Sequence, residues 1–421
     1  MAMKRLNRDS IRPGDILFSA RPGAVGKTIR GLTRGEVSHA MICVQHSSFI
    51  DSTMEGVHAR NVQRLFFEDD EIVFHFRLSE DVAPERLAAI IEYARSQIGA
   101  RYSLPEAARS VMAVRKPRTR KQFCSRLVAQ AYKSAGFELV PDADYCSPEM
   151  LRRSPLLLEL PVQTEAVTAK ELDWWNNNPD AVERTLGGYS RFFSLVRKFA
   201  PNVETQDDLL RLRIHNVEAD PHVVEAFHQS GFLDLWRIDI HLHPWRYDLA
   251  LMAQQRGNHL RPYCVSTIQE AYTGGLRFAQ NLATLRRFHK DFPRPSLELE
   301  IKLYKTLAQN HQSRREVAYS WLLAHHPDDL ARHMEQIAPH SSEWFRIVQV
   351  VDEDLANLSG YAIQQEGSSF VCSSCGELPA RAYRIVNEAD VNPGVPSLSL
   401  CEDCLEIRRG LGYVLQPFLE Q

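Results

Sequence analysis

The sequence lacks the features that define several classes of protein. No apolar run approaches the roughly 20 residues that a transmembrane helix needs, so we expect no membrane-spanning segment. Charge of one sign is not in excess, and the net charge of -3 argues against nucleic-acid binding and against a membrane-surface protein. The basic N-terminal segment MAMKRLNRDSIRPGD is not followed by an apolar stretch, so no secretory signal peptide is expected. These absences predict a cytoplasmic protein, unless a dedicated secretion system exports it.

Cysteine is too sparse for a disulfide framework. The chain has 421 residues and eight cysteines, whereas extracellular disulfide scaffolds are much denser. Half of the cysteines form two CxxC pairs near the C-terminus, which is typical of a metal site in a reducing compartment. The chain length, with 44% hydrophobic residues, exceeds what one ordinary core accommodates, so two or three domains are expected.

The N-terminal part of the chain has the pattern of strands followed by helices. Short apolar runs separated by Gly, Ser and Asp predict strands at GDILFSA, HAMICV, FIDST and EIVFHFRL. Apolar residues at helical spacing then predict a helix at 85–97, introduced by Pro84, and a second helix at 124–135. This order is typical of an α+β fold.

The sequence predicts three domains. A Pro- and Leu-rich connection at 154–163 closes an α+β domain at residues 1–155. Residues 165–355 are predicted to form a mostly helical domain of unknown role, and residues 360–421 a small module that contains the CxxC pairs. The helical domain or the C-terminal module is a possible site for a protein partner.

Cys124 is the candidate nucleophile. A catalytic thiol needs surroundings that stabilise the thiolate, such as a helix N-terminus or neighbouring basic groups. Cys124 lies at the start of the second predicted helix, and five basic residues lie just upstream at 115–121. That basic segment is equally compatible with a solvated surface loop. Cys43, Cys146 and Cys264 are expected to pack as small core residues.

The base for such a nucleophile must come from elsewhere in the fold. His39 opens a predicted strand after a turn that contains Gly and Ser. Asp51, in the next predicted strand, could accept a hydrogen bond from the second ring nitrogen of His39 and so select its tautomer. The sequence alone does not set the strand register, so Glu55 and His58 remain alternatives to Asp51 in this third role.

Residues 12–153 resemble the circularly permuted NlpC-type, papain-like cysteine hydrolases, the YiiX/YebB-like group that is related to lecithin retinol acyltransferase. The resemblance is carried by RPGDILF (12–18), VSHAMICV (37–44), FIDST (49–53), IGARYS (98–103) and FCSRLVAQAYKSAG (123–136). It implies a permuted papain-like fold with Cys124 as nucleophile, His39 as base and Asp51 as the residue that orients His39. Many relatives have an acidic residue two positions after the cysteine, where this chain has Arg126, so Arg126 is expected to affect which substrate is accepted.

A Cys–His pair of this kind carries out acyl transfer. The thiolate attacks a carbonyl, a backbone N–H near the helix start stabilises the oxyanion, and the histidine moves the proton. Water as the acceptor gives a peptidase, amidase or thioesterase that acts on a peptide, amide or other acyl substrate. The alternatives are an acyltransferase onto a lipid or protein acceptor, and a binding or scaffold protein that keeps the fold without turnover.

The C-terminal cysteines are candidate metal ligands. Cys372 and Cys375 form one CxxC pair, and Cys401 and Cys404 form the other. Four thiolates satisfy a tetrahedral Zn²⁺ and leave no position for water, so a structural zinc ion is predicted rather than a catalytic one. ARAYRIV and SLSL between the pairs are predicted strands, and CLEIRRG begins a predicted helix. The module resembles zinc ribbons and treble clefs.

Overall fold

The computed structural model describes residues 3–20, 35–45, 48–107, 119–177, 181–257, 259–270, 276–333, 337–386 and 395–418. The chain divides into two compact units, Met1–Leu242 and His243–Gln421. The boundary between these units falls inside the region for which the sequence predicts one helical domain, and the three-domain division stays a prediction. Among the described residues, no helix combines the length and apolar character that crossing a bilayer requires.

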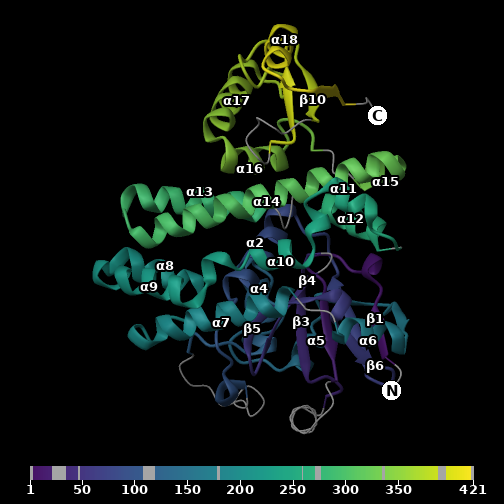
Figure 1. Ribbon diagram of the computed structural model, residues 1–421, viewed down its shortest axis with the longest axis vertical. Helices are drawn as coiled ribbons and strands as arrows, with labels where there is room; N and C mark the ends of the chain where they lie inside the picture. Colours follow the sequence, from purple (N-terminus) through teal and green to yellow (C-terminus); the bar gives the residue numbers. More distant parts are fainter. Residues whose placement is uncertain are drawn as a thin grey trace. The chain divides into compact units, whose positions relative to one another are not determined.

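A six-stranded antiparallel sheet is the centre of the first unit (Figure 1). Its strands lie in the order β5-β4-β3-β2-β7-β8. They are β2 (Ile16–Ser19), β3 (His39–Gln45), β4 (Ser48–Thr53), β5 (Gly56–Asn61), β7 (Val73–Leu78) and β8 (Leu157–Leu160). A smaller antiparallel sheet has the order β6-β1-β9 and comprises β1 (Met3–Leu6), β6 (Phe66–Glu68) and β9 (Thr164–Val167).

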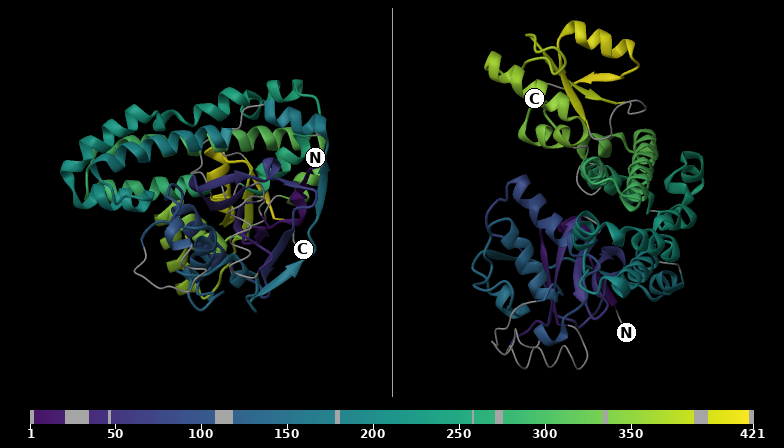
Figure 2. Two further views of the ribbon diagram at one scale, coloured as in Figure 1. Left: turned by 90° about the horizontal axis from the view of Figure 1, so that it is seen from below. Right: turned by 90° about the vertical axis from the view of Figure 1, so that its left-hand side faces the viewer.

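Two helices cover one face of the large sheet, as the two views of Figure 2 also show. They are α2 (Pro84–Ser96) and α4 (Cys124–Ser134), and both pack against β3. Alternate residues of the strands, such as Phe18 and Ile42, form the buried core beneath them. Residues of the opposite parity, such as Met41 and Phe49, form a second core on the other face.

Helix α4 is held by burial along its length. Every residue from Cys124 to Tyr132 is buried, and each fully buried side chain such as Leu127 or Val128 contributes about 1.5–3 kcal/mol. Phe123, which precedes the helix, is extended and makes no side-chain cap. The first turn of α4 therefore keeps backbone N–H groups that can face an anion.

The rest of the first unit is helical. Its helices are α5 (Pro148–Arg152), α6 (Ala169–Asn177), α7 (Ala181–Phe199), α8 (Gln206–His215), α9 (Asp220–Ser230) and α10 (Arg237–Leu242). Helix α7 packs on α9 and also contacts β5 of the large sheet. Since β5 is the edge strand next to β4, α7 lies close to this edge of the sheet.

The second unit combines a helical layer with a small sheet. The helical layer contains α11 (Leu249–Gln254), α12 (Leu260–Gln269), α13 (Leu276–Asp291), α14 (Pro295–His325) and α15 (Pro327–His333). The C-terminal module contains α16 (Ser342–Val351), α17 (Glu353–Glu366), β10 (Arg381–Ile385), β11 (Ser397–Leu400), α18 (Glu402–Gly410) and β12 (Leu415–Pro417). Its sheet has the order β11-β10-β12.

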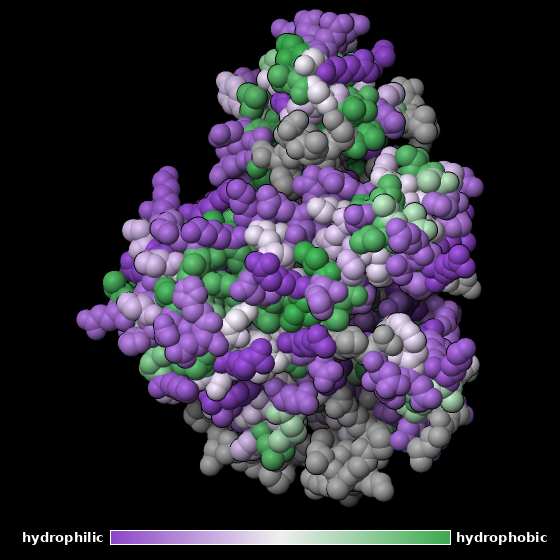
Figure 3. All heavy atoms as spheres, in the orientation of Figure 1, coloured by the Kyte–Doolittle hydropathy of each residue, from purple (hydrophilic) through white to green (hydrophobic). Residues whose placement is uncertain are grey.

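The C-terminal module has its own core, and this core includes α16, which lies within the range 165–355 predicted for the middle domain. Trp344 and Val348 of α16 are fully buried against Tyr383 and Leu398 of the small sheet. Hydrophilic and hydrophobic side chains are both exposed on this module (Figure 3). Its large exposed apolar side chains are Leu358, Tyr361, Phe370, Leu378, Ile407, Leu411 and Val414. A protein partner for this module stays a prediction.

The mixed α+β character agrees with the prediction. The two helices that the sequence predicts for the N-terminal domain, α2 and α4, lie within one residue of their expected bounds. The short strands β1, β5, β6, β8, β9 and β12 lie outside the predicted strands, and β8 lies within the segment 154–163 that is predicted as a connection. Most of the basic segment at 115–121 lies outside the described residues. The structure describes only Thr119, Arg120 and Lys121 of this segment.

Candidate active site and metal centre

Cys124 is the first residue of α4 and is 5% exposed. Burial raises the pKa of its thiol, whereas His39 and the backbone N–H groups of Ala40 and Ser125 lower this pKa. One of these groups comes from β3 and the other from the first turn of α4. The nucleophile that the sequence predicts is therefore held at the junction of the helix and the sheet.

His39 and Asp51 lie on adjacent strands. Met41 pairs with Asp51 in the antiparallel register, so Asp51 is a diagonal neighbour of His39 on the same face of the sheet. The distance from His39 Nε2 to Asp51 Oδ2 is 2.8 Å. His39 is 4% exposed and Asp51 is fully buried, so water does not compete for this hydrogen bond.

His39 interacts with Cys124 as well as with Asp51. Because Nε2 bonds to Asp51, Nδ1 remains for the hydrogen bond that joins the ring to Cys124. Burial disfavours the imidazolium, but the hydrogen bonds to Asp51 and Cys124 outweigh it and raise the pKa of His39. Burial also opposes the thiolate, yet the hydrogen bond and charge of His39 lower the pKa of Cys124. Both shifts favour a thiolate–imidazolium pair.

Other buried thiols in the chain provide a contrast. Burial raises the pKa of Cys146 far above the ordinary thiol value, and burial raises the pKa of Cys264 to about 12. Burial alone therefore makes a thiol inert in this protein, and the neighbourhood of His39 reverses that effect at Cys124.

Asp51 is the centre of a larger polar network. Arg60 Nε lies 3.1 Å from Asp51 Oδ1 and 3.0 Å from Oδ2, and His58 Nε2 lies 3.5 Å from Oδ1. Burial opposes ionisation of Asp51, but His39, Arg60 and His58 hold its pKa well below the ordinary range. Glu55 is mostly exposed, and its Oε2 lies 4.0 Å from His58 Nε2. Asp51, Glu55 and His58 are the three candidates for the residue that orients His39. Of these, Asp51 is the one that hydrogen bonds to His39.

The sequence analysis did not single out Arg60. Strand alternation could have found it, because His58 pairs with Asp51 and Arg60 follows two residues later on the same face. The pairing partner of β5 is set by tertiary structure, however, so the short run GVHARN alone does not show that these side chains surround Asp51.

Arg126 has a different position from the one expected. Its side chain is fully buried, and Nη1 donates to Glu106 Oε2 at 3.0 Å and to the Lys121 carbonyl at 3.0 Å. Nε donates to the Asp144 carbonyl at 2.8 Å. Arg126 thus ties together the segments around Cys124, and its buried side chain does not reach the surface.

Replacing Glu106 with glutamine is expected to lower the free energy of unfolding by about 3–5 kcal/mol, because Arg126 then keeps a buried charge without its carboxylate. Burial opposes ionisation of Glu106, but hydrogen bonds from Arg126 and Thr119 lower its pKa to about 2. The stabilisation is therefore present above the ordinary carboxyl pKa and is lost as pH falls toward the lowered one.

The urea concentration at which the fully buried Cys146 becomes reactive toward a thiol reagent measures this change in the free energy of unfolding within the first unit. The exposed Glu92 on α2 provides the control, since Glu92→Gln should change stability by less than about 0.5 kcal/mol. Equal exposure of Cys146 in the Glu106 variant and the control would contradict the role of the buried pair.

The four C-terminal cysteines come together at one point. Their sulfur atoms all lie within 4.8 Å of one another, and Cys375 Sγ lies 3.6 Å from Cys401 Sγ. None of the four forms a disulfide bond. Tetrahedral ligands at a Zn–S distance of about 2.3 Å are separated by about 3.8 Å, so the cluster fits a four-thiolate metal site.

The local structure around this cluster follows the predicted pattern. Gly376 has φ of 81° and closes the turn after the first pair. Cys401 precedes α18, and Cys404 lies in its first turn. His340 supports the first knuckle, since its Nε2 lies 2.8 Å from Ser373 Oγ.

Residues 10–153 match the model of a family described as permuted papain-like amidase enzymes, YaeF/YiiX, C92 family. The match covers about a third of the chain. It supports a permuted papain-like domain of the amidase or hydrolase class in the N-terminal part, the part that contains His39, Asp51 and Cys124.

A solved structure is also similar to this chain. It is the metalloprotein yiiX from Escherichia coli O157:H7, at 14% identity over 36% of this chain and 97% of the other, with a TM-score of 0.24. No curated protein matches the sequence. These values are too low for the chemistry of yiiX to be carried over to this protein.

Proposed function

We propose that the N-terminal domain is a cysteine hydrolase that cleaves a peptide, amide or other acyl bond through a thioacyl-enzyme intermediate. Cys124 is the nucleophile, His39 is the base and acid, and Asp51 orients His39. The observation that carries the proposal is a buried cysteine at the start of a helix beside a histidine whose Nε2 hydrogen bonds to a buried carboxylate at 2.8 Å. The match of residues 10–153 to an amidase family supports the same class of reaction.

The mechanism follows from this geometry. The Cys124 thiolate attacks the substrate carbonyl carbon, and the carbonyl electrons move to oxygen. Backbone N–H groups at the start of α4 are suited to stabilise that oxyanion. Protonated His39 gives its Nδ1 proton to the leaving amine or alcohol as the carbon–heteroatom bond breaks, which leaves a thioester on Cys124.

The second half of the reaction regenerates the enzyme. His39, now neutral, takes a proton from water, and the resulting hydroxide attacks the thioester carbonyl. The carbon–sulfur bond breaks, the acid is released, and the thiolate–imidazolium pair is restored. Asp51 stays ionised throughout, because its pKa is held well below the ordinary range, and it stabilises the imidazolium in each half. An alcohol or amine in place of water would make the same site an acyltransferase.

We propose Zn²⁺ as the ion for the C-terminal cluster, held by Cys372, Cys375, Cys401 and Cys404. Four sulfur donors suit a structural zinc site and leave no coordination position for a reacting water. The ion would tie the turn before β10 to the start of α18, on either side of the module's core.

An acyl-enzyme trap tests the proposed function. Brief treatment with p-nitrophenyl acetate is expected to release one equivalent of p-nitrophenol in a burst and to add one acetyl group to Cys124, as measured by intact mass and peptide mapping. His39→Ala should reduce the burst rate by about 100-fold or more, whereas Cys146→Ser should leave it unchanged. A wild-type burst that does not depend on His39, or acetylation that favours other cysteines, would support a non-catalytic binding protein instead. Turnover that speeds up with an added alcohol or amine would favour the acyltransferase.

A further inference from the structure

The chain segment 99–103 connects two parts of the candidate site. On one side, Gly99 N donates to the Val57 carbonyl at 3.0 Å, and Val57 N donates to the Ala100 carbonyl at 2.9 Å. On the other side, Gln122 N donates to the Arg101 carbonyl at 2.9 Å. Val57 precedes His58 in β5, and Gln122 lies two residues before the nucleophile. The segment therefore links the sheet that holds Asp51 to the start of α4.

Glycine makes the first of these contacts possible. Gly56 has φ of +103°, and a Cβ built there would lie 2.7 Å from the Ala100 carbonyl oxygen. Gly99 has φ of +94°, and a Cβ there would lie 2.9 Å from the ring of Phe193 in α7. The segment thus approaches the sheet and α7 at the same time.

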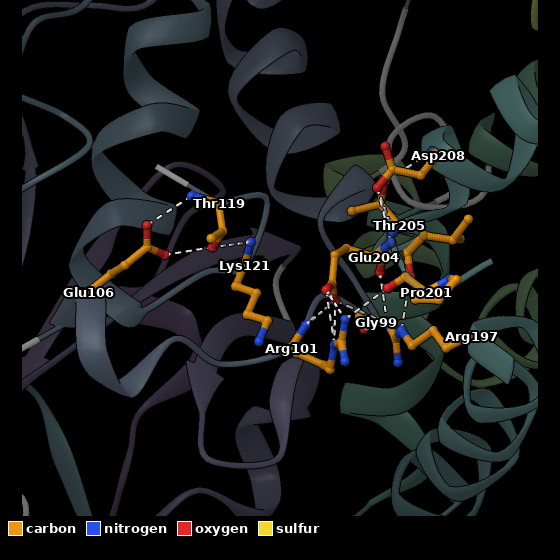
Figure 4. Close-up of polar contacts among 11 residues, drawn as sticks. Gly99, Arg101, Glu106, Thr119, Lys121, Arg197, Pro201, Glu204, Thr205 and Asp208 are labelled. Carbon is orange, nitrogen blue, oxygen red and sulfur yellow. Dashed lines mark hydrogen bonds and ion pairs between the residues drawn. The ribbon is translucent and has the colours of Figure 1, made fainter. Parts of the chain in front are cut away.

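The turn between α7 and α8 holds this segment by its backbone (Figure 4). Glu204, which is 4% exposed, accepts from Arg101 N at 3.1 Å and from Arg101 Nε at 2.9 Å. Arg197 Nη2 donates to the Gly99 carbonyl at 2.8 Å and lies 3.4 Å from Glu204 Oε2. Asp208 accepts from Glu204 N at 3.0 Å and pairs with Arg120, which is four residues before the nucleophile.

These contacts come from outside the part of the chain that matches the hydrolase family. Residues 10–153 contain the Cys–His pair, whereas Arg197, Glu204 and Asp208 follow later in the chain. A buried carboxylate shared by two arginines and a backbone N–H is costly to disturb, because loss of the carboxylate leaves buried donors unsatisfied.

We propose that the α7–α8 hairpin is a positioning element of the active site and that Glu204 is its positioning residue. It holds segment 99–103 in register with both β5 and Gln122, and this keeps Cys124 within hydrogen-bond distance of His39. The inference rests on the proposed function, and it assigns to the helical region a role in assembling the site.

The pH dependence of Cys124 alkylation by iodoacetamide tests this role in the full-length protein. Glu204→Gln is expected to lower the alkylation rate near pH 6 by roughly 10-fold, the equivalent of one pKa unit in the thiol. The rates should converge above about pH 9.5, where the thiolate forms without help from His39. Glu204→Asp should recover part of the loss. The exposed Asp207, in the first turn of α8, gives the control Asp207→Asn, which should match the wild type.

A milder variant guards against misfolding. Arg101→Gln removes a guanidinium whose side chain is 45% exposed but keeps the backbone N–H that bonds to Glu204, and it is expected to lower the rate near pH 6 by roughly threefold. Unchanged pH profiles in both variants, with or without a lower melting temperature, would overturn the inference. A wild-type profile with an ordinary thiol pKa would instead overturn the proposed function, so the two failures are distinguishable.

Discussion

Asp51→Asn is expected to lower the rate of Cys124 alkylation near pH 6 by roughly 10- to 100-fold, because each pKa unit gained by the thiol removes tenfold of its thiolate. Asp51 raises the pKa of His39, and protonated His39 lowers the pKa of Cys124. Without the carboxylate, His39 loses its proton at lower pH and the thiol keeps its own to higher pH. In serine hydrolases the corresponding change lowers kcat by about 10⁴-fold, and we expect turnover here to fall further than alkylation.

The measurement is a pH series of iodoacetamide alkylation rates at Cys124, resolved by peptide mapping. The wild-type rate should stay high below the ordinary thiol pKa of about 8.5 and fall only when pH drops through the lowered pKa of Cys124. The Asp51→Asn profile should move toward higher pH and meet the wild-type profile where both thiols are fully ionised.

Two variants decide among the alternatives that the sequence left open. Glu55→Gln is the matched carboxylate control and should leave the profile unchanged, since Glu55 is mostly exposed and lies beside His58. His58→Gln should have a smaller effect than Asp51→Asn, because His58 contacts Asp51 at 3.5 Å. A profile that moves with His58 but not with Asp51 would assign the third role to His58.

Removal of the metal from the C-terminal module is the second change with a large expected effect. Structural zinc in zinc-finger peptides binds with an apparent free energy of about 10–16 kcal/mol, and that energy is also folding energy. We expect one Zn²⁺ per chain and loss of the module's tertiary structure on chelation, because the cluster joins the turn before β10 to α18.

Metal analysis and hydrogen exchange of the full chain measure this effect. After chelation, the amides of β10 and β11 should lose protection, while the alkylation rate of Cys124 should stay unchanged. Cys375→Ala should have the same consequence as chelation. Cys264→Ala is the control, since Cys264 is a buried thiol of the same unit that lies outside the cluster. Full protection without bound metal would contradict a structural zinc site.

Local patterns in the sequence were enough to place several features of the molecule. The periodicity of apolar residues predicts α2 and α4, because a helix places every third or fourth residue on the same face. The two CxxC pairs predict a metal cluster, because each pair brings two thiolates together within one turn. Cys124 and His39 could be proposed as partners because each lies at the start of its own predicted element and because the motifs around them resemble those of the permuted papain-like hydrolases.

The remaining features depend on contacts between distant parts of the chain. The pairing of Met41 with Asp51 decides which acidic residue reaches His39, and strand register is a property of two strands together. Arg126 is buried because Glu106 and the Asp144 carbonyl surround it, which no run of residues around position 126 indicates. Glu204 meets Arg101 across 103 positions of sequence. The sequence itself thus determined the candidate residues for the proposed chemistry, whereas only the tertiary structure decided which of them meet, because hydrogen bonds and burial depend on distances that local periodicity does not contain.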